Sequence, residues 1–150
     1  MGYYVDLIRS SAIIPTDKLD EALRVLKELN ETRDDLKTGG SWSGGEKKGS
    51  WFAWMPEDWA TFESVQEVLT SAGFEECHIT VYGLHIDGYH NKTGCEGIFM
   101  AAIAHLVESG SEMEWRGEEG ELYKWSFSKD GMSEWGGEFV WTHCGAPIKL

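Results

Sequence analysis

The sequence predicts an α+β domain in which three amphipathic helices pack on a largely antiparallel sheet that ends in a three-stranded meander. Apolar residues recur at three- and four-residue spacing in three segments, which is typical of helices with one buried face. From Glu112 onward the period changes to two, as in strands with one buried face. Such helices and strands bury their apolar faces against one another, which favours one two-layer domain spanning 1–150.

The first third of the chain begins with a strand and a helix. Residues 3–8 alternate as a strand, and Thr16 is expected to cap a helix with an apolar stripe formed by Leu19, Ala22, Leu23, Leu26 and Leu29. Residues 37–50 are rich in Gly, Ser and Lys, so we expect a mobile loop there.

The middle of the chain is expected to hold a short buried strand, a second helix and a hairpin. The strand is WFAWM (51–55), and Pro56 with the acids after it signals a helix start. The apolar stripe of this helix is Phe62, Val65, Val68, Leu69 and Ala72. Gly73 closes the helix, and residues 74–89 form a hairpin about Gly83.

Thr93 and Glu96 have the spacing of a capping box, which predicts a third helix ending at Gly110. The meander follows, with its apolar rows at Met113 and Trp115, at Tyr123, Trp125 and Phe127, and at Phe139 and Trp141. The pair Gly136-Gly137 predicts a bulge or bend in the last strand.

Charge and cysteine usage limit the classes of function. The chain has 13 basic and 26 acidic residues, a net charge of −13, of which −1 lies in residues 1–50 and −12 in the remainder. Direct binding to nucleic acid or to an anionic membrane is therefore not expected. The N-terminus lacks the pattern of a secretory signal, and the odd set of three cysteines is typical of a reducing compartment, so we expect a cytoplasmic protein.

Residues 88–141, GYHNKTGCEGIFMAAIAHLVESGSEMEWRGEEGELYKWSFSKDGMSEWGGEFVW, resemble a family of small uncharacterised bacteriophage and prophage proteins with GYDNKTG-like and EWRGEDG-like motifs. A weaker similarity reaches IIPTDKLDEAL and WFAWMPEDW (51–59) upstream. His90 and Glu119 stand where the family tends to have Asp. The resemblance implies a phage-type origin and residence in the host-cell cytoplasm, and it implies no mechanism.

Acidic residues cluster along the predicted meander, and they form the first candidate site. They are Glu112, Glu114, Glu118, Glu119, Glu121, Glu134 and Glu138. A solvated face kept soluble by charge explains such a cluster, but carboxylates on a rigid sheet also imitate a row of phosphates. Glu112 and Glu114 share a face about 7 Å apart, so the leading hypothesis is a non-enzymatic accessory protein that binds a basic host protein through this surface.

The alternative is a protein that sequesters a nucleotide-like signalling molecule. Trp42 lies between glycines in the expected loop, and an indole with nearby cations could close over an aromatic anion. A flexible linker is the simpler interpretation. The residues assigned to this site are Trp42, Lys47, Lys48, Trp54 and Arg116.

A metal site or an enzyme is the third hypothesis. Cys77, His78, His85 and His90 lie in or beside the expected hairpin, but adjacent Cys77 and His78 point to opposite faces of a strand, and no metal-ligand spacing occurs. No set of nucleophile, base and orienting residue is apparent. We therefore expect neither catalytic residues nor a cofactor.

Overall fold

The computed structural model describes residues 2–37, 39–43, 46–142 and 145, and it has the expected α+β architecture. Its main sheet contains five antiparallel strands in the order β10-β9-β8-β1-β7. Their bounds are β1 Tyr4–Ser10, β7 His90–Lys92, β8 Glu112–Gly117, β9 Leu122–Ser128 and β10 Gly131–Gly137. The last three strands form the expected C-terminal meander, and β1 lies between β7 and β8.

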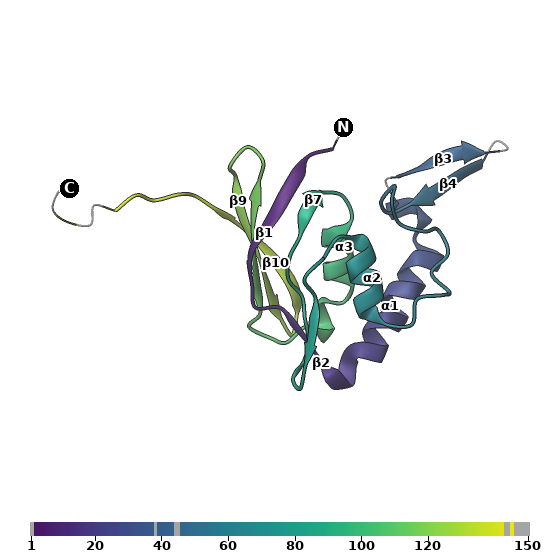
Figure 1. Ribbon diagram of the computed structural model, residues 1–150, viewed down its shortest axis with the longest axis horizontal. Helices are drawn as coiled ribbons and strands as arrows, with labels where there is room; N and C mark the ends of the chain where they lie inside the picture. The colour runs from purple at the N-terminus through teal and green to yellow at the C-terminus, as the bar shows by residue number, and fades with distance from the viewer. Residues whose placement is uncertain (1, 38, 44–45, 143–144, 146–150) are drawn as a thin grey trace.

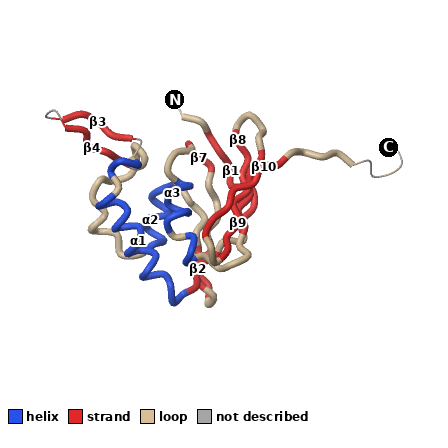
Figure 2. The backbone as a smooth tube through the Cα atoms, turned by 180° about the vertical axis from the view of Figure 1, so that it is seen from behind, coloured by secondary structure: helices blue, strands red, loops and turns tan. Residues whose placement is uncertain are grey.

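The helices cover one face of this sheet and leave the other face to solvent (Figures 1 and 2). They are α1 Leu19–Thr32, α2 Val65–Ala72 and α3 Glu96–Ala102. We call the covered face the inner face and the opposite one the outer face. Four residues of the predicted apolar rows are buried on the inner face: Met113 and Trp115 of β8, and Trp125 and Phe127 of β9. The alternation in the sequence therefore predicted their buried positions correctly.

Aromatic side chains dominate the core between sheet and helices. Phe99 of α3 is fully buried, and its ring makes edge contacts with the rings of Trp51 and Trp59 at centroid distances of 5.2 and 5.7 Å. On the sheet side, Trp115 contacts Trp125 at 4.7 Å. This packing ties the segment after residue 50 to α3.

A smaller sheet with the order β2-β6-β5 adjoins the main one. Its strands are β2 Ile13–Pro15, β5 His78–Thr80 and β6 Gly83–His85. The antiparallel pairing of β5 with β6 confirms the expected hairpin at Gly83. Val81 and Tyr82 at its tip are 90% and 75% exposed.

The described residues between 37 and 50 include two strands where a loop was expected. They contain an antiparallel hairpin of β3 Gly39–Ser43 and β4 Glu46–Ser50, which projects beyond α1 (Figure 1). The two backbones pair along five positions even though the composition resembles that of a linker. The sequence analysis missed these strands, and the mobility of the segment stays a prediction.

The segment 51–64 also differs from the expectation. WFAWM forms turns instead of a strand, with Met55 N–H donating to the Phe52 carbonyl, and adjacent Trp51 and Phe52 are both buried. Pro56 does not start a helix. The second helix begins at Val65, where Ser64 Oγ accepts from Glu67 N–H as the cap, so Phe62 lies before the helix. Gly73 closes α2 with a φ of 126°, as expected.

The ends of the other two helices lie elsewhere than predicted. Thr16 makes no capping hydrogen bond and belongs to a 3-10 turn over Thr16–Lys18 that precedes α1. The third helix ends at Ala102 instead of Gly110 and is followed by a 3-10 turn, Ala104–Leu106. Glu96 accepts from the Thr93 hydroxyl and from Gly94 N–H, so the two box residues do interact, although Cys95 is the residue at the cap position.

The last predicted apolar row is not part of the core. The strand β10 ends at Gly137 with regular pairing to β9, so Gly136-Gly137 forms no bulge. Phe139 and Trp141 lie beyond it and are 59% and 93% exposed. Within the described ranges, no helix is both long and apolar enough to cross a membrane.

Candidate functional site

The outer face of the main sheet carries charges of both signs. Residues opposite each other in an antiparallel register share a face, and the register therefore assigns four cations and three carboxylates of the described strands to the outer face: Arg9, Lys92, Arg116, Lys124, Asp6, Glu112 and Glu114. Because their charges nearly cancel, the outer face is far less acidic than the chain as a whole.

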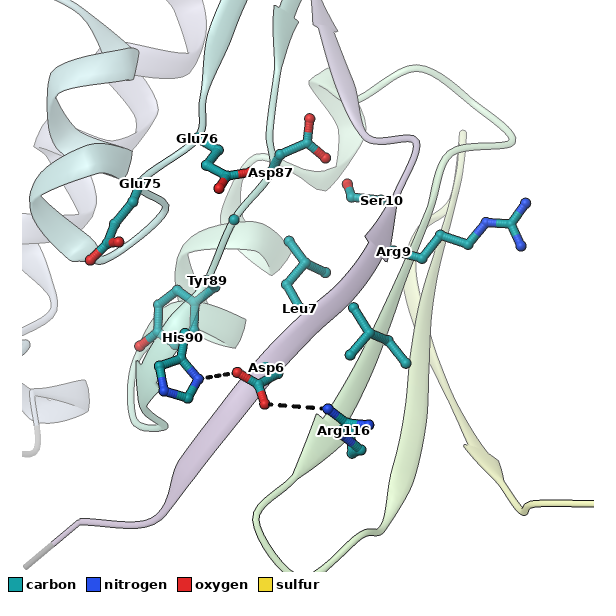
Figure 3. A pocket seen from close by; sticks show the side chains of 12 residues that line it. Asp6, Leu7, Arg9, Ser10, Glu75, Glu76, Asp87, Tyr89, His90 and Arg116 are labelled. Carbon is teal, nitrogen blue, oxygen red and sulfur yellow. Dashed lines mark hydrogen bonds and ion pairs between the residues drawn. The ribbon is translucent and has the colours of Figure 1, made fainter.

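Several of these charges are matched directly. Lys124 Nζ lies 2.7 Å from Glu112 Oε2. Asp6 accepts a hydrogen bond from His90 and lies 3.8 Å from Arg116, as Figure 3 shows. Glu114 has no ion pair among the described residues, although Arg9 is its register partner.

The other predicted acidic residues lie in three separate places. Glu118, Glu119 and Glu121 lie at the turn between β8 and β9, where the Tyr3 hydroxyl donates to Glu121 and lowers the pKa of that carboxyl. Glu134 is on the inner side of β10 and accepts from Trp125 Nε1 at 3.0 Å. Glu138 follows β10. The structure therefore does not gather the seven glutamates into one row.

A groove of about 390 Å³ crosses the outer face beside the end of β10. The side chains that form it include Ile8, Glu114, Leu122, Lys124, Trp135 and Glu138. Trp135 is 56% exposed, and its Nε1 donates to Ser126 Oγ at 2.8 Å, which fixes the indole on the sheet. Sequence reasoning missed Trp135. The glycine pair that follows Trp135 could have indicated its exposure, because glycines have no side chains to cover the indole.

The chain beyond β10 presents a run of exposed apolar residues. Phe139, Val140 and Trp141 are 59%, 78% and 93% exposed, and the segment extends away from the body of the molecule (Figure 1). The strand β10 that leads into it is at the edge of the main sheet. Trp135, Glu138, Phe139, Val140 and Trp141 together are called the C-terminal surface below.

The residues of the predicted nucleotide site lie in three separate places. Three of them are in the β3–β4 hairpin, where the backbone of Trp42 pairs with that of Lys47 and the backbone of Ser41 with that of Lys48, on the far side of the helices from the sheet (Figures 1 and 2). Arg116 is on the outer face of the sheet. Trp54 is 42% exposed, stacks on Phe52 at 4.5 Å and donates to the Ser71 carbonyl.

A second cavity, of about 480 Å³, lies between β1 and the segment before β7 (Figure 3). Glu75, Glu76 and Asp87 lie on one side of it, and Asp6, Arg9 and Arg116 lie on the other (Figure 3). His90 also lines it. Burial raises the pKa of Asp87, and the nearby histidines oppose this shift.

The histidines and cysteines named from the sequence form no cluster of three possible metal ligands within the described part of the chain. His78 and His85 stack at 4.7 Å, whereas His90 contacts Asp6 instead. Cys144 lies outside the described residues.

Cys77 is expected to alkylate slowly in the folded protein. Burial raises the pKa of its thiol to about 11, two units above the ordinary value of 9.0, so the thiolate fraction at pH 7.5 falls by about 100-fold. Iodoacetamide labelling followed by peptide mass spectrometry measures the rate at Cys77 alone, and the urea-unfolded chain is the control. Equal rates in both states would contradict this protection.

Comparisons with known proteins identify no relative. No protein-family model, no curated protein and no solved structure matches the chain. The similarity to phage proteins therefore remains a prediction from the sequence motifs.

Proposed function

We propose that this protein acts by binding a partner protein of basic charge through its C-terminal surface. One observation carries the proposal: three consecutive large apolar residues, Phe139 to Trp141, are exposed at the end of an edge strand. Contiguous exposed apolar groups of this kind mark interaction sites, because burying them on a partner removes their surface from water.

The chemistry of the C-terminal surface favours a protein as the ligand. Tryptophan is enriched among the residues that contribute most to binding energy at protein interfaces, and Trp135 and Trp141 both lie on this surface. The edge of β10 adds backbone N–H and C=O groups with which an extended peptide can pair. Side-chain pockets along the sheet would then select the partner.

The charge of the chain favours a basic partner. Residues 51–150 carry −12 of the total −13, and Glu138 lies between Trp135 and the exposed residues Phe139 to Trp141 in the sequence. Opposite charge on the partner accelerates encounter, and salt screens this attraction. The predicted row of seven glutamates is replaced in this proposal by a smaller acidic and aromatic surface.

The biological setting of the proposal is the host-cell cytoplasm, as the phage-type motifs imply. In that setting the protein is a non-enzymatic accessory factor that occupies a surface of a host protein.

Joint replacement of Phe139 and Trp141 with serine is expected to reduce partner capture from bacterial lysate at least tenfold, because the variant loses the apolar area that the partner covers. Both side chains are exposed, so the melting temperature should stay the same. Affinity capture at 50 and 300 mM salt, with quantification by mass spectrometry, tests both the surface and the charge dependence.

The matched control replaces Val81 and Tyr82 with serine. These residues are as exposed as Phe139 and Trp141 but lie at the tip of the β5–β6 hairpin. Equal losses in the two variants, or capture that does not weaken with salt, would argue against the C-terminal surface as the binding site.

A further inference from the structure

We propose that the groove beside Trp135 binds an arginine side chain of the partner, an inference that rests on the proposed function and adds a specificity site to it. The groove opens on the outer face at the root of the exposed segment, since Gly136, Gly137 and Glu138 form one of its walls. A peptide that covers Phe139 to Trp141 and continues along the end of β10 therefore reaches it.

The charges that line the groove favour a cation. Glu114 and Glu138 contribute two carboxylates, and Lys124 contributes one ammonium group. The ammonium is already held by Glu112, at 2.7 Å. Glu114, by contrast, pairs with no described cation, so its carboxylate remains available to a ligand.

Trp135 supplies an aromatic plate in the same groove as these carboxylates. Glu114, Lys124 and Trp135 form one row across β8, β9 and β10, because Glu114 is opposite Lys124 and Lys124 is opposite Trp135. Neighbouring strands are about 4.8 Å apart, so Glu114 and Trp135 are separated by about 10 Å along the row. The hydrogen bond of the indole to Ser126 fixes the ring, and binding therefore costs little side-chain entropy.

Arginine fits this arrangement better than lysine. The planar guanidinium stacks on an indole and also donates two parallel hydrogen bonds to a carboxylate, whereas an ammonium acts as a point charge. The aliphatic part of the side chain would lie on Ile8 and Leu122, which give the groove its apolar floor.

The cavity near Asp87 does not offer the same chemistry. Its carboxylates share the lining with two arginines and a histidine, and Asp6 already interacts with Arg116 and His90. It has no tryptophan in its lining. The groove beside Trp135 is therefore the site that the observations favour for arginine.

The test uses a twelve-residue peptide of alternating arginine and threonine, and the same peptide with citrulline in place of arginine. Binding is followed by NMR through the indole Nε1–H resonance of Trp135 and by calorimetry at low salt. We expect the arginine peptide to shift this resonance and the citrulline peptide to leave it unchanged. Glu114→Gln should raise the dissociation constant about tenfold, and Trp135→Leu should raise it severalfold.

Glu118→Gln is the matched control, because it makes the same change in net charge at the exposed turn between β8 and β9. It should alter the dissociation constant less than twofold. Equal effects of the Glu114 and Glu118 variants, equal binding of the two peptides, or binding without a shift of the Trp135 resonance would overturn the arginine site.

The two proposals fail in distinguishable ways. Loss of the arginine site leaves capture that depends on Phe139 and Trp141 intact, and the partner then binds by the exposed segment alone. Selective binding of the arginine peptide without such capture supports the groove and removes the proposed role of the exposed segment.

Discussion

Replacement of Phe99 by alanine is expected to lower the free energy of unfolding by about 3–5 kcal/mol, because it leaves a cavity at the centre of the aromatic core. The ring of Phe99 contacts those of Trp51, Phe52 and Trp59 and is fully shielded from solvent. In a domain of this size the melting temperature should fall by about 10 °C or more. Urea unfolding followed by circular dichroism measures the change.

The control for this variant is Phe99→Leu, which keeps most of the apolar volume and should cost about half as much or less. A loss below about 1 kcal/mol for the alanine variant would show that the segment 51–62 is not packed against α3 as described. A similar loss for both variants would show that the ring-to-ring contacts of Phe99, and not the volume that it fills, make the larger contribution to stability.

Replacement of Gly83 by alanine is expected to cost at least about 3 kcal/mol, since backbone strain and a steric clash act together. Gly83 has a φ of 144°, and a Cβ there would lie 2.0 Å from the carbonyl oxygen of Ile14. That oxygen belongs to the backbone of β2, so the pairing of β2 with β6 would have to shift. Thermal and urea unfolding measure the loss.

Gly120→Ala separates strain from clash. Gly120 also has a positive φ, 89°, but no atom lies within 4 Å of a Cβ built there. Its replacement should cost only about 1–2 kcal/mol. If the two variants are equally destabilised, the steric clash with Ile14 adds nothing to the cost of the Gly83 replacement.

The sequence predicted best those elements whose apolar pattern repeats over several turns. Residues 19–32 show the helical period over four turns, and α1 forms there. Trp115 and Trp125 follow the period of two, and both are buried. Such patterns arise because one face of each element must be buried, and they do not depend on the rest of the chain.

The failures occur where tertiary packing decides the backbone. Adjacent Trp51 and Phe52 both point into the core, which a regular strand does not allow, so the chain turns there. Conversely, Phe139 and Trp141 have the spacing of a strand, but no segment among the described residues covers them. Periodicity reports which residues could share a buried face, and it does not report whether a covering layer exists.

The candidate site was predictable only in part. The alternation of residues in the sequence predicted that Glu112 and Glu114 share one face of a strand, and the register of β8 with β9 confirms this. The face on which Glu134 lies depends on the register set by the turn before β10, and that register puts it with the inner residues. The salt bridge from Lys124 to Glu112, which leaves Glu114 for a ligand, depends on pairing between two strands and is not encoded in either strand alone.

The position of β1 between β7 and β8 has a consequence for biosynthesis. Asp6 of this strand pairs with Arg116, so β1 meets β8 only after about 110 more residues have been joined. At roughly 5–20 residues per second, this interval lasts about 6–22 s. During this interval the backbone groups of β1 that pair with β8 in the folded protein are bound to water instead, and chaperones that shield extended chains have time to act on β1 before the sheet closes.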